Sequence, residues 1–201
     1  MTIITANNNS LANITALPSS ITGGAMTLLA TQTASGSANL SFTSGIDDTY
    51  DSYVFKFINI HPATGGNFEF NMSTDGGSNY NVTKTTTWFY TTHKEDDAAT
   101  ALSYSAGSDL AQSTAFQKIS DGVGNGNDEC ASGTLQLFNP SSTTFVKHFI
   151  GNANNIYQSP AYTQESFVAG YGNTTSAIDG VRFQMASGNI DSGVIKLYGI
   201  S

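Results

Sequence analysis

The sequence predicts an all-β protein, and three observations support that fold class. Runs rich in Thr, Val, Ile, Phe and Tyr recur along most of the chain, and the gaps between them are rich in Gly, Pro, Asn, Asp and Ser. Hydrophobic residues make up 39% of the 201 residues and charged residues only 11%, which is typical of a chain that folds around a core. This length suits one large β-domain.

The first part of the chain, residues 1–25, is polar and rich in Asn, Ser and Thr. Its apolar pieces are short and separated, which predicts an extended arm rather than a core segment. Because a partner chain would hold such an arm, its apolar residues are candidate assembly contacts. We therefore divide the chain into this arm and a single β-sandwich domain, residues 26–201. The candidate contacts are Ile3, Ile4, Leu11, Ile14 and Leu17.

The β-domain divides into successive strand-like runs separated by turn residues. Residues 102–132 are the least regular part. There the run 110–119 suits either a short helix or a strand, and the composition of residues 121–129 predicts a loop. The predicted strands are MTLLATQT (26–33), ANLSF (38–42), YVFKFINIH (53–61), NFEFNMS (67–73), YNVTKTTTWFY (80–90), TLQLFN (134–139), TTFVKHFIGN (143–152), QESFVAGYG (164–172), GVRFQMAS (180–187) and GVIKLYGI (193–200).

Alternation of apolar and polar residues indicates which strand faces are buried. In the run 180–187, Val181, Phe183 and Met185 fall on one face and polar residues on the other, as in a strand with one solvated face. The run 53–61 is apolar on both faces, so it is either a central, doubly covered strand or a strand with one face against another subunit. Its two apolar sets are Tyr53, Phe55 and Phe57 on one face, and Val54, Ile58 and Ile60 on the other.

The charge distribution argues against nucleic acid and membrane partners. Fifteen acidic residues and seven basic ones give a net charge of -8, and the basic residues are scattered singly rather than clustered. No apolar run is long enough to span a membrane, and the N-terminus lacks the features of a signal peptide, so we expect synthesis in a reducing cytoplasm. The single cysteine, Cys130, follows two acids, which predicts a raised thiol pKa and no disulfide.

The stretch STDGGSNY (73–80) is close to the Asp-box pattern of glycan hydrolases and predicts a tight β-hairpin. A sialidase would need several arginines to bind the substrate carboxylate, but Arg182 is the only arginine in the chain. A glycosidase could instead use two carboxylates, and Glu69 and Glu165 are the only acids inside strand-like runs. Alternation allows both to face solvent, so we interpret 73–80 as a structural turn.

No metal or cofactor motif is present in the sequence. The three histidines, His61, His93 and His148, lack the spacing of metal ligands. The segment 121–129 is acidic, but Val123 stands where a calcium loop needs an oxygen ligand. We therefore expect neither a cofactor nor a bound metal.

Three consecutive aromatic residues, Trp88, Phe89 and Tyr90, cannot all point to the same face of a strand. Exposed rings of this kind form stacking platforms for sugars in carbohydrate-binding modules. They also anchor oligomer interfaces or fill sandwich cores. All three residues are therefore candidate glycan or interface aromatics.

Several long stretches of the chain support a resemblance to a known family. They are SFTSGIDDTYDSYVFKFINIHPAT, STDGGSNYNVTKTTTWF, DLAQSTAF, LFNPSSTTFVKHFIG, AGYGNTTSAID and SGNIDSGVIKLYGI, and together they cover most of residues 10–200. In these stretches the chain resembles small virion structural proteins of tailed bacteriophages, marine ones in particular. These family members are components of head-decoration, head-fibre or tail-fibre type.

The resemblance implies a virion structural protein without enzymatic activity, and it brings no catalytic residues. The expected fold is a jelly-roll-like antiparallel β-sandwich that forms a homo-oligomer, a trimer, on the particle surface, after synthesis in the host cytoplasm. Its arm would bind the major capsid protein or another virion protein. The alternative is a tail-fibre or appendage domain that binds host-surface polysaccharide. Because the chain contains no heptads, collagen-like repeats or β-helix repeats for a shaft, a capsid decoration, cement or head-fibre role is favoured.

Overall fold

The computed structural model describes residues 26–157 and 162–201, and within them it confirms the all-β prediction. The candidate contacts of the arm, Ile3, Ile4, Leu11, Ile14 and Leu17, lie outside the described residues. The strands are β1 (Thr27–Ser37), β2 (Leu40–Phe42), β3 (Ser52–Pro62), β4 (Gly66–Ser73), β5 (Lys84–Lys94), β6 (Thr100–Tyr104), β7 (Gln117–Val123), β8 (Ala131–Phe138), β9 (Lys147–Ile156), β10 (Tyr162–Gly172), β11 (Gly180–Met185) and β12 (Ile190–Ile200).

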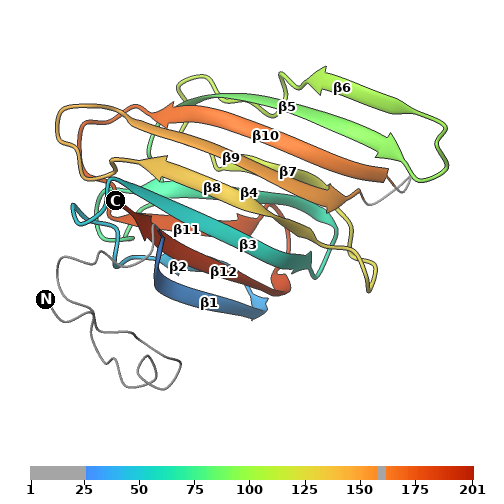
Figure 1. Ribbon diagram of the computed structural model, residues 1–201, viewed down its shortest axis with the longest axis horizontal. Helices are drawn as coiled ribbons and strands as arrows, with labels where there is room; N and C mark the ends of the chain where they lie inside the picture. The colour runs from blue at the N-terminus through green and yellow to red at the C-terminus, as the bar shows by residue number, and fades with distance from the viewer. Residues whose placement is uncertain (1–25, 158–161) are drawn as a thin grey trace, which may run out of the picture.

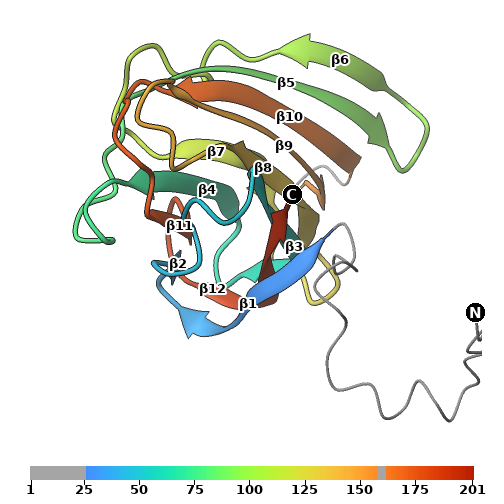
Figure 2. The same cartoon turned by 60° about the vertical axis from the view of Figure 1, so that its left-hand side comes forward.

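The strands form two antiparallel sheets. The large sheet has eight strands in the order β1-β12-β3-β8-β9-β10-β5-β6, and the small sheet has four in the order β2-β11-β4-β7. Figures 1 and 2 show the large sheet curving around the small one, so that the two form a sandwich. Each sheet therefore has an inner face that contributes to the shared core and an outer face.

Eight of the strands pair in a nested order. The first pairs with the last, β1 with β12, and the next pairs inward are β2 with β11, β3 with β8, and β4 with β7. Successive pairs lie alternately in the large and the small sheet. A long antiparallel ribbon rolled between two sheets in this way is compatible with a jelly roll. The predicted antiparallel β-sandwich is thus confirmed.

Two hairpins extend the large sheet beyond this nested set. The β9–β10 hairpin continues from β8, and the β5–β6 hairpin follows it, so that β6 lies at the free edge of the sheet. Figure 1 shows β6 at the top, away from the small sheet. The strand β7 packs against β9 and β10 from the small-sheet side. The large sheet is therefore longer than the small sheet that covers it.

The core is built around aromatic rings on β11 and its neighbours. Val181, Phe183 and Met185 are all buried, as the alternation of the sequence predicts. The Phe183 ring lies 5.1 Å from the ring of Phe55 and 5.1 Å from that of Phe57, measured between centroids. These contacts join the small sheet to β3 of the large sheet and fix the spacing of the two layers.

One irregularity of β3 corrects the face assignment made from the sequence. Ile58 and Ile60 were predicted to share a face, but Ile58 is 40% exposed while Ile60 is fully buried. Between them Asn59 has a positive φ of 51°, and the register against β8 shifts between Phe57 and Ile60. After such a β-bulge every later residue of the strand points to the face opposite to the one that alternation predicts, so Ile60 points into the core.

The irregular region 102–132 contains the whole of β7, a strand that the sequence left undecided. The run 110–119 is not helical, and its end forms the start of β7. The predicted loop 121–129 is wrong at its beginning, because β7 continues to Val123, which is fully buried. Burial of the apolar Val123 side chain keeps this part of the chain in the strand, although its composition indicated a loop. Gly122, just before it, has a positive φ of 57°.

The segment STDGGSNY forms a tight turn, but the predicted hairpin is wrong. The strand before it, β4, belongs to the small sheet, and the strand after it, β5, begins at Lys84 and belongs to the large sheet. Within the turn, Asp75 Oδ1 accepts hydrogen bonds from the Asn79 N–H and the Ser73 hydroxyl, both at 2.8 Å. The glycines Gly76 and Gly77 supply the positive φ values of 69° and 84°. The segment is a crossover between layers.

Candidate interaction surface

The outer face of the large sheet carries an exposed aromatic row. Tyr104, Phe89, Phe167 and Asn152 lie directly opposite one another across β6, β5, β10 and β9. Phe89 is 40% exposed and Tyr104 is 56% exposed. The rings of Phe89 and Phe167 are stacked, with centroids 4.8 Å apart and an angle of 11° between their planes. Strand alternation places this row away from the core.

A second row on the same face surrounds a shallow hollow. Ala169 lies opposite Thr87 on one side and Ile150 on the other, and Ile150 is 58% exposed. The hollow has a volume of about 480 Å³ and mainly apolar walls. It could accept a large apolar side chain or a small ligand. Its lining includes Thr85, Thr87, Phe138, His148, Ile150 and Tyr171.

Amide and hydroxyl groups dominate the polar part of this face. The Asn152 side chain donates to Glu165 Oε1 at 2.7 Å and accepts from the Thr134 hydroxyl at 2.9 Å. Glu165 thus lies beside an amide rather than beside another acid. The second candidate acid, Glu69, lies on the outer face of the small sheet, where burial raises its carboxyl pKa and the charge of Lys118 opposes that shift. The two carboxylates therefore lie on opposite faces of the sandwich and do not form the pair considered from the sequence.

The three consecutive aromatics occupy three different environments. Trp88 is fully buried in the core, so the glycan-platform alternative is wrong for this residue and the sandwich-core alternative is confirmed. Tyr90 is half-buried on the same inner side, with its ring 5.4 Å from that of Trp88. Phe89 alone points outward. Successive side chains of a strand point to opposite faces, so Trp88 and Tyr90 on β5 face inward while Phe89 faces outward.

The histidines are separated in the structure. His61 Nδ1 lies 2.6 Å from the carbonyl oxygen of Glu129, and His93 Nε2 lies 2.9 Å from Asp97 Oδ1. His148 lies on the outer face of the large sheet, beside Tyr171. Within the described parts of the chain, no group of three or more His, Cys, Asp or Glu side chains is placed to hold a metal ion.

The cysteine has the raised thiol pKa that the sequence predicts. The flanking acids were the expected cause, whereas the structure attributes the rise in the pKa of Cys130 to burial. A thiol of this kind is mostly protonated at neutral pH and is a weak nucleophile.

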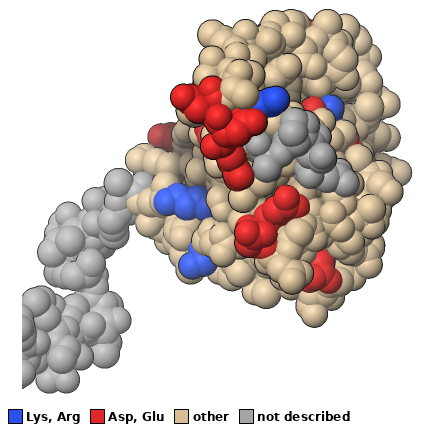
Figure 3. All heavy atoms as spheres, turned by 90° about the vertical axis from the view of Figure 1, so that its right-hand side faces the viewer, with Lys and Arg blue, Asp and Glu red and all other residues tan. Residues whose placement is uncertain are grey.

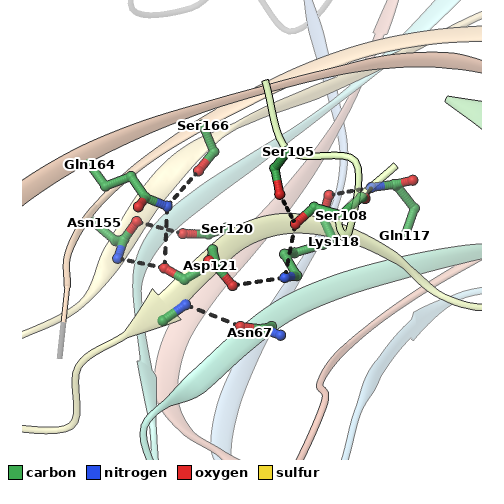
Figure 4. A network of polar contacts seen from close by, with 11 residues as sticks. Asn67, Ser105, Ser108, Gln117, Lys118, Ser120, Asp121, Asn155, Gln164 and Ser166 are labelled. Atoms are coloured by element: carbon green, nitrogen blue, oxygen red, sulfur yellow. Dashed lines mark hydrogen bonds and ion pairs between the residues drawn. The ribbon is translucent and has the colours of Figure 1, made fainter. Parts of the chain in front are cut away.

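A buried polar network, which the sequence analysis missed, joins β7 to the inserted β9–β10 hairpin (Figure 4). The Ser120 hydroxyl donates to Asn155 Oδ1 at 2.8 Å, and Asn155 in turn donates to the carbonyl oxygen of Asp121 at 3.1 Å. Gln164 Nε2 donates to the Ser166 hydroxyl at 3.1 Å. Because these side chains bond one another, the network explains how polar residues can be buried where the hairpin packs on the small sheet.

Two lysines, Lys84 and Lys147, are also buried, and the sequence analysis did not single them out. Lys147 Nζ donates to the carbonyl oxygens of Ser142 and Phe145, both at 2.6 Å. Lys84 Nζ donates to Asn71 Oδ1 at 2.6 Å. Burial lowers the pKa of both amines, that of Lys84 to about 7. The signal that could have found Lys147 is its alternation with Phe149, a core residue, along the same strand.

Charged side chains on the surface are few. Figure 3 shows acidic side chains in patches, with few basic ones, on the side of the molecule that is at the right of Figure 1. The turn between β5 and β6 has three exposed acids in succession, Glu95, Asp96 and Asp97. On the outer face of the large sheet, by contrast, Lys56 and Lys196 lie directly opposite each other on β3 and β12.

Comparison with known proteins gives no further assignment. No protein-family model matches the chain, and neither does any curated protein or solved structure. Among the residues that the structure describes, no helix is long and apolar enough to cross a membrane. The molecule is thus characterised by its fold and its surface: an antiparallel β-sandwich with a broad outer sheet face on which apolar and amide side chains mix.

Proposed function

We propose that the chain is a structural protein of a bacteriophage particle, a capsid decoration, cement or head-fibre protein on the particle surface. It forms a homo-oligomer and is bound through its arm, residues 1–25, to the major capsid protein or another virion protein. The family resemblance of the sequence supports this role. The structural observation that supports it best is the outer face of the large sheet.

That face has the composition of an interaction surface. Leu102 is 72% exposed and Ile150 is 58% exposed, and both lie on the sheet face that carries Phe89, a face with few charges. Protein interfaces are depleted in charge and enriched in aromatic residues in the same way, and exposed apolar patches mark contact sites. The nested strand order also occurs in viral capsid domains and in lectins. Because a fold alone does not assign a function, the surface is the stronger argument.

Removal of the arm should abolish attachment to the particle. We expect a chain without residues 1–24 to fold as a soluble β-domain and to be absent from purified virions, because the arm is the proposed anchor. The measurement is immunoblotting and labelled electron microscopy of particles that are made without the native protein and supplied with either the full chain or the shortened one. Particles without the protein should lose head stability against heat and low salt.

The control for this experiment is the full chain with Phe145→Ala, which changes an exposed side chain outside the arm. It should be incorporated as well as the unchanged protein. Full incorporation of the shortened chain would contradict the anchoring role of the arm. Particles that keep their head stability but lose host adsorption would contradict the decoration role.

A second candidate function is recognition of host-surface glycans by a tail-fibre or appendage domain. The observation that favours it is the exposed Phe89 ring stacked on Phe167, which lies opposite Asn152 of the hydrogen-bonded pair Asn152 and Glu165, since aromatic faces and amide groups together bind sugars. On this hypothesis Phe89→Ala should weaken binding on an array of host polysaccharides by about tenfold. Phe145→Ala should leave it unchanged. The absence of binding to any host polysaccharide would exclude this candidate.

A further inference from the structure

We propose that the outer face of the large sheet binds a second copy of this chain head to tail. In this contact the acidic β5–β6 turn of one copy lies over Lys56 and Lys196 of the next. The inference deepens the homo-oligomer of the proposed function by naming its surfaces. It concerns the purified chain, so it can be tested without the particle.

The first argument is the exposed β5–β6 hairpin. Among the described strands, its outer strand β6 has β5 as its only hydrogen-bonded neighbour, and it lies at the edge of the sheet in both views (Figures 1 and 2). Leu102 and Tyr104 on this strand are 72% and 56% exposed. A sheet edge with exposed apolar side chains is a site of association unless something covers it. A partner that covers the hairpin would remove this exposed area from water.

The second argument is the pair of lysines. Lys56 and Lys196 face each other directly across β3 and β12, and like charges in that position repel. The described residues contain one ion pair between a lysine and an acid, Lys118 with Asp121, and a contact of His93 with Asp97, and neither involves these lysines. Their own neighbours in the same row are threonines, Thr31 and Thr134, and Lys56 Nζ lies 5.4 Å from the centre of the Tyr198 ring. The pair therefore offers two positive charges to an acidic partner.

The third argument is that the matching acids lie on the same chain but out of reach. Glu95, Asp96 and Asp97 are exposed at the β5–β6 turn. Four strand spacings separate β5 from β3 in the large sheet, which at about 4.8 Å each is roughly 19 Å. The acids and the lysines thus complement each other only between two copies. A contact between two different surfaces is heterologous, and it closes into a ring when the rotation allows.

Apolar side chains accompany each charged end and can form the centre of the contact. Leu102 and Tyr104 lie on β6, next to the acidic turn, and Ile58, which is 40% exposed, follows Lys56 on β3. Interfaces derive most of their affinity from such a centre, whereas charges at the rim fix orientation and partner choice. The arrangement therefore suits an oriented, repeating contact between copies.

Charge reversal with rescue tests the proposal on the full purified chain. We expect the unchanged protein to be a ring-shaped oligomer by native mass spectrometry and light scattering. The double variant Lys56→Glu, Lys196→Glu should dissociate with an apparent Kd raised by roughly tenfold or more. Adding Glu95→Lys and Asp96→Lys to that variant should restore the oligomer, because the signs of both surfaces are then exchanged.

The matched control adds Asp48→Lys and Asp51→Lys to the lysine variant, which gives the same net charge at two exposed acids outside the proposed contact. It should not restore assembly. Urea unfolding should show that every variant is folded. A monomeric unchanged protein, an undisturbed oligomer in the lysine variant, or rescue by the control would each overturn the proposal. If the unchanged full chain forms the ring but does not attach to virions, the proposed function fails while the contact between copies stands.

Discussion

Phe183→Ala should lower the free energy of unfolding by about 3–5 kcal/mol, the range found when a buried aromatic ring is truncated. Phe183 is fully buried at the centre of the sandwich. Its ring packs against those of Phe55 and Phe57 on the large sheet and is stacked on that of Phe68 at 5.9 Å. Removal of the ring therefore leaves a cavity and breaks several aromatic contacts at once.

The measurement is urea unfolding followed by the fluorescence of Trp88, the only tryptophan of the chain. Phe145→Ala is the matched control, since Phe145 is 69% exposed and its truncation should change the free energy by less than about 0.5 kcal/mol. A typical domain has only about 5–15 kcal/mol of stability in total, so the loss at Phe183 would be large. A loss below about 1 kcal/mol at Phe183 would show that the two sheets are not held together by this cluster.

The sequence predicted this core because alternation is a local property of a strand. Val181, Phe183 and Met185 could be assigned to one buried face from their spacing alone. The same rule misplaced Ile60, because a bulge at Asn59 changes the facing of all later residues and its positive φ leaves no periodic signal in the sequence. Local pattern thus predicts faces up to the first irregularity.

The local pattern of the sequence could not predict contacts between segments that are distant along the chain. The turn at residues 73–80 was identified from its Asp and Gly residues, yet nothing local shows that β4 and β5 belong to different sheets. Trp88 and Phe89 were both candidate surface aromatics, and only the packing of β5 decides that the first is buried and the second exposed. The sequence could therefore predict that aromatic residues form part of the candidate surface, but not which of them are exposed there.

Lys84 was the least predictable feature, because a lone lysine in a strand is normally a solvated charge. Its Nζ donates to Asn71 Oδ1 at 2.6 Å and to the carbonyl oxygen of Val82 at 2.8 Å. A neutral amine has two N–H groups for these two acceptors, whereas the ammonium form carries a third. Burial lowers the pKa of Lys84 from 10.5 to about 7, so the folded protein favours the neutral amine above neutral pH.

This lowered pKa makes stability depend on pH in a definite direction. Between about pH 7 and pH 10.5, Lys84 binds a proton in the unfolded chain but not in the folded one. The stability contributed by this group therefore rises with pH in that window, by up to about 1.4 kcal/mol for each pH unit and on the order of 5 kcal/mol across it. Below pH 7 both states are protonated and the dependence ends.

Lys84→Met should remove this dependence, and the difference between the two proteins is the quantity to measure. The free energy of unfolding is measured for the unchanged protein and the variant at pH 7, 8 and 9. As the pH rises, the value for the unchanged protein should increase relative to that for the variant, by roughly 1–3 kcal/mol over the range. Tyrosines whose pKa is raised in the fold, such as Tyr53, affect both proteins equally and cancel. Lys94→Met, at the other end of β5, is the control and should give a constant difference. A constant difference for Lys84→Met as well would show that the buried amine keeps its proton, so that its bonds to Asn71 and Val82 would be those of an ammonium group.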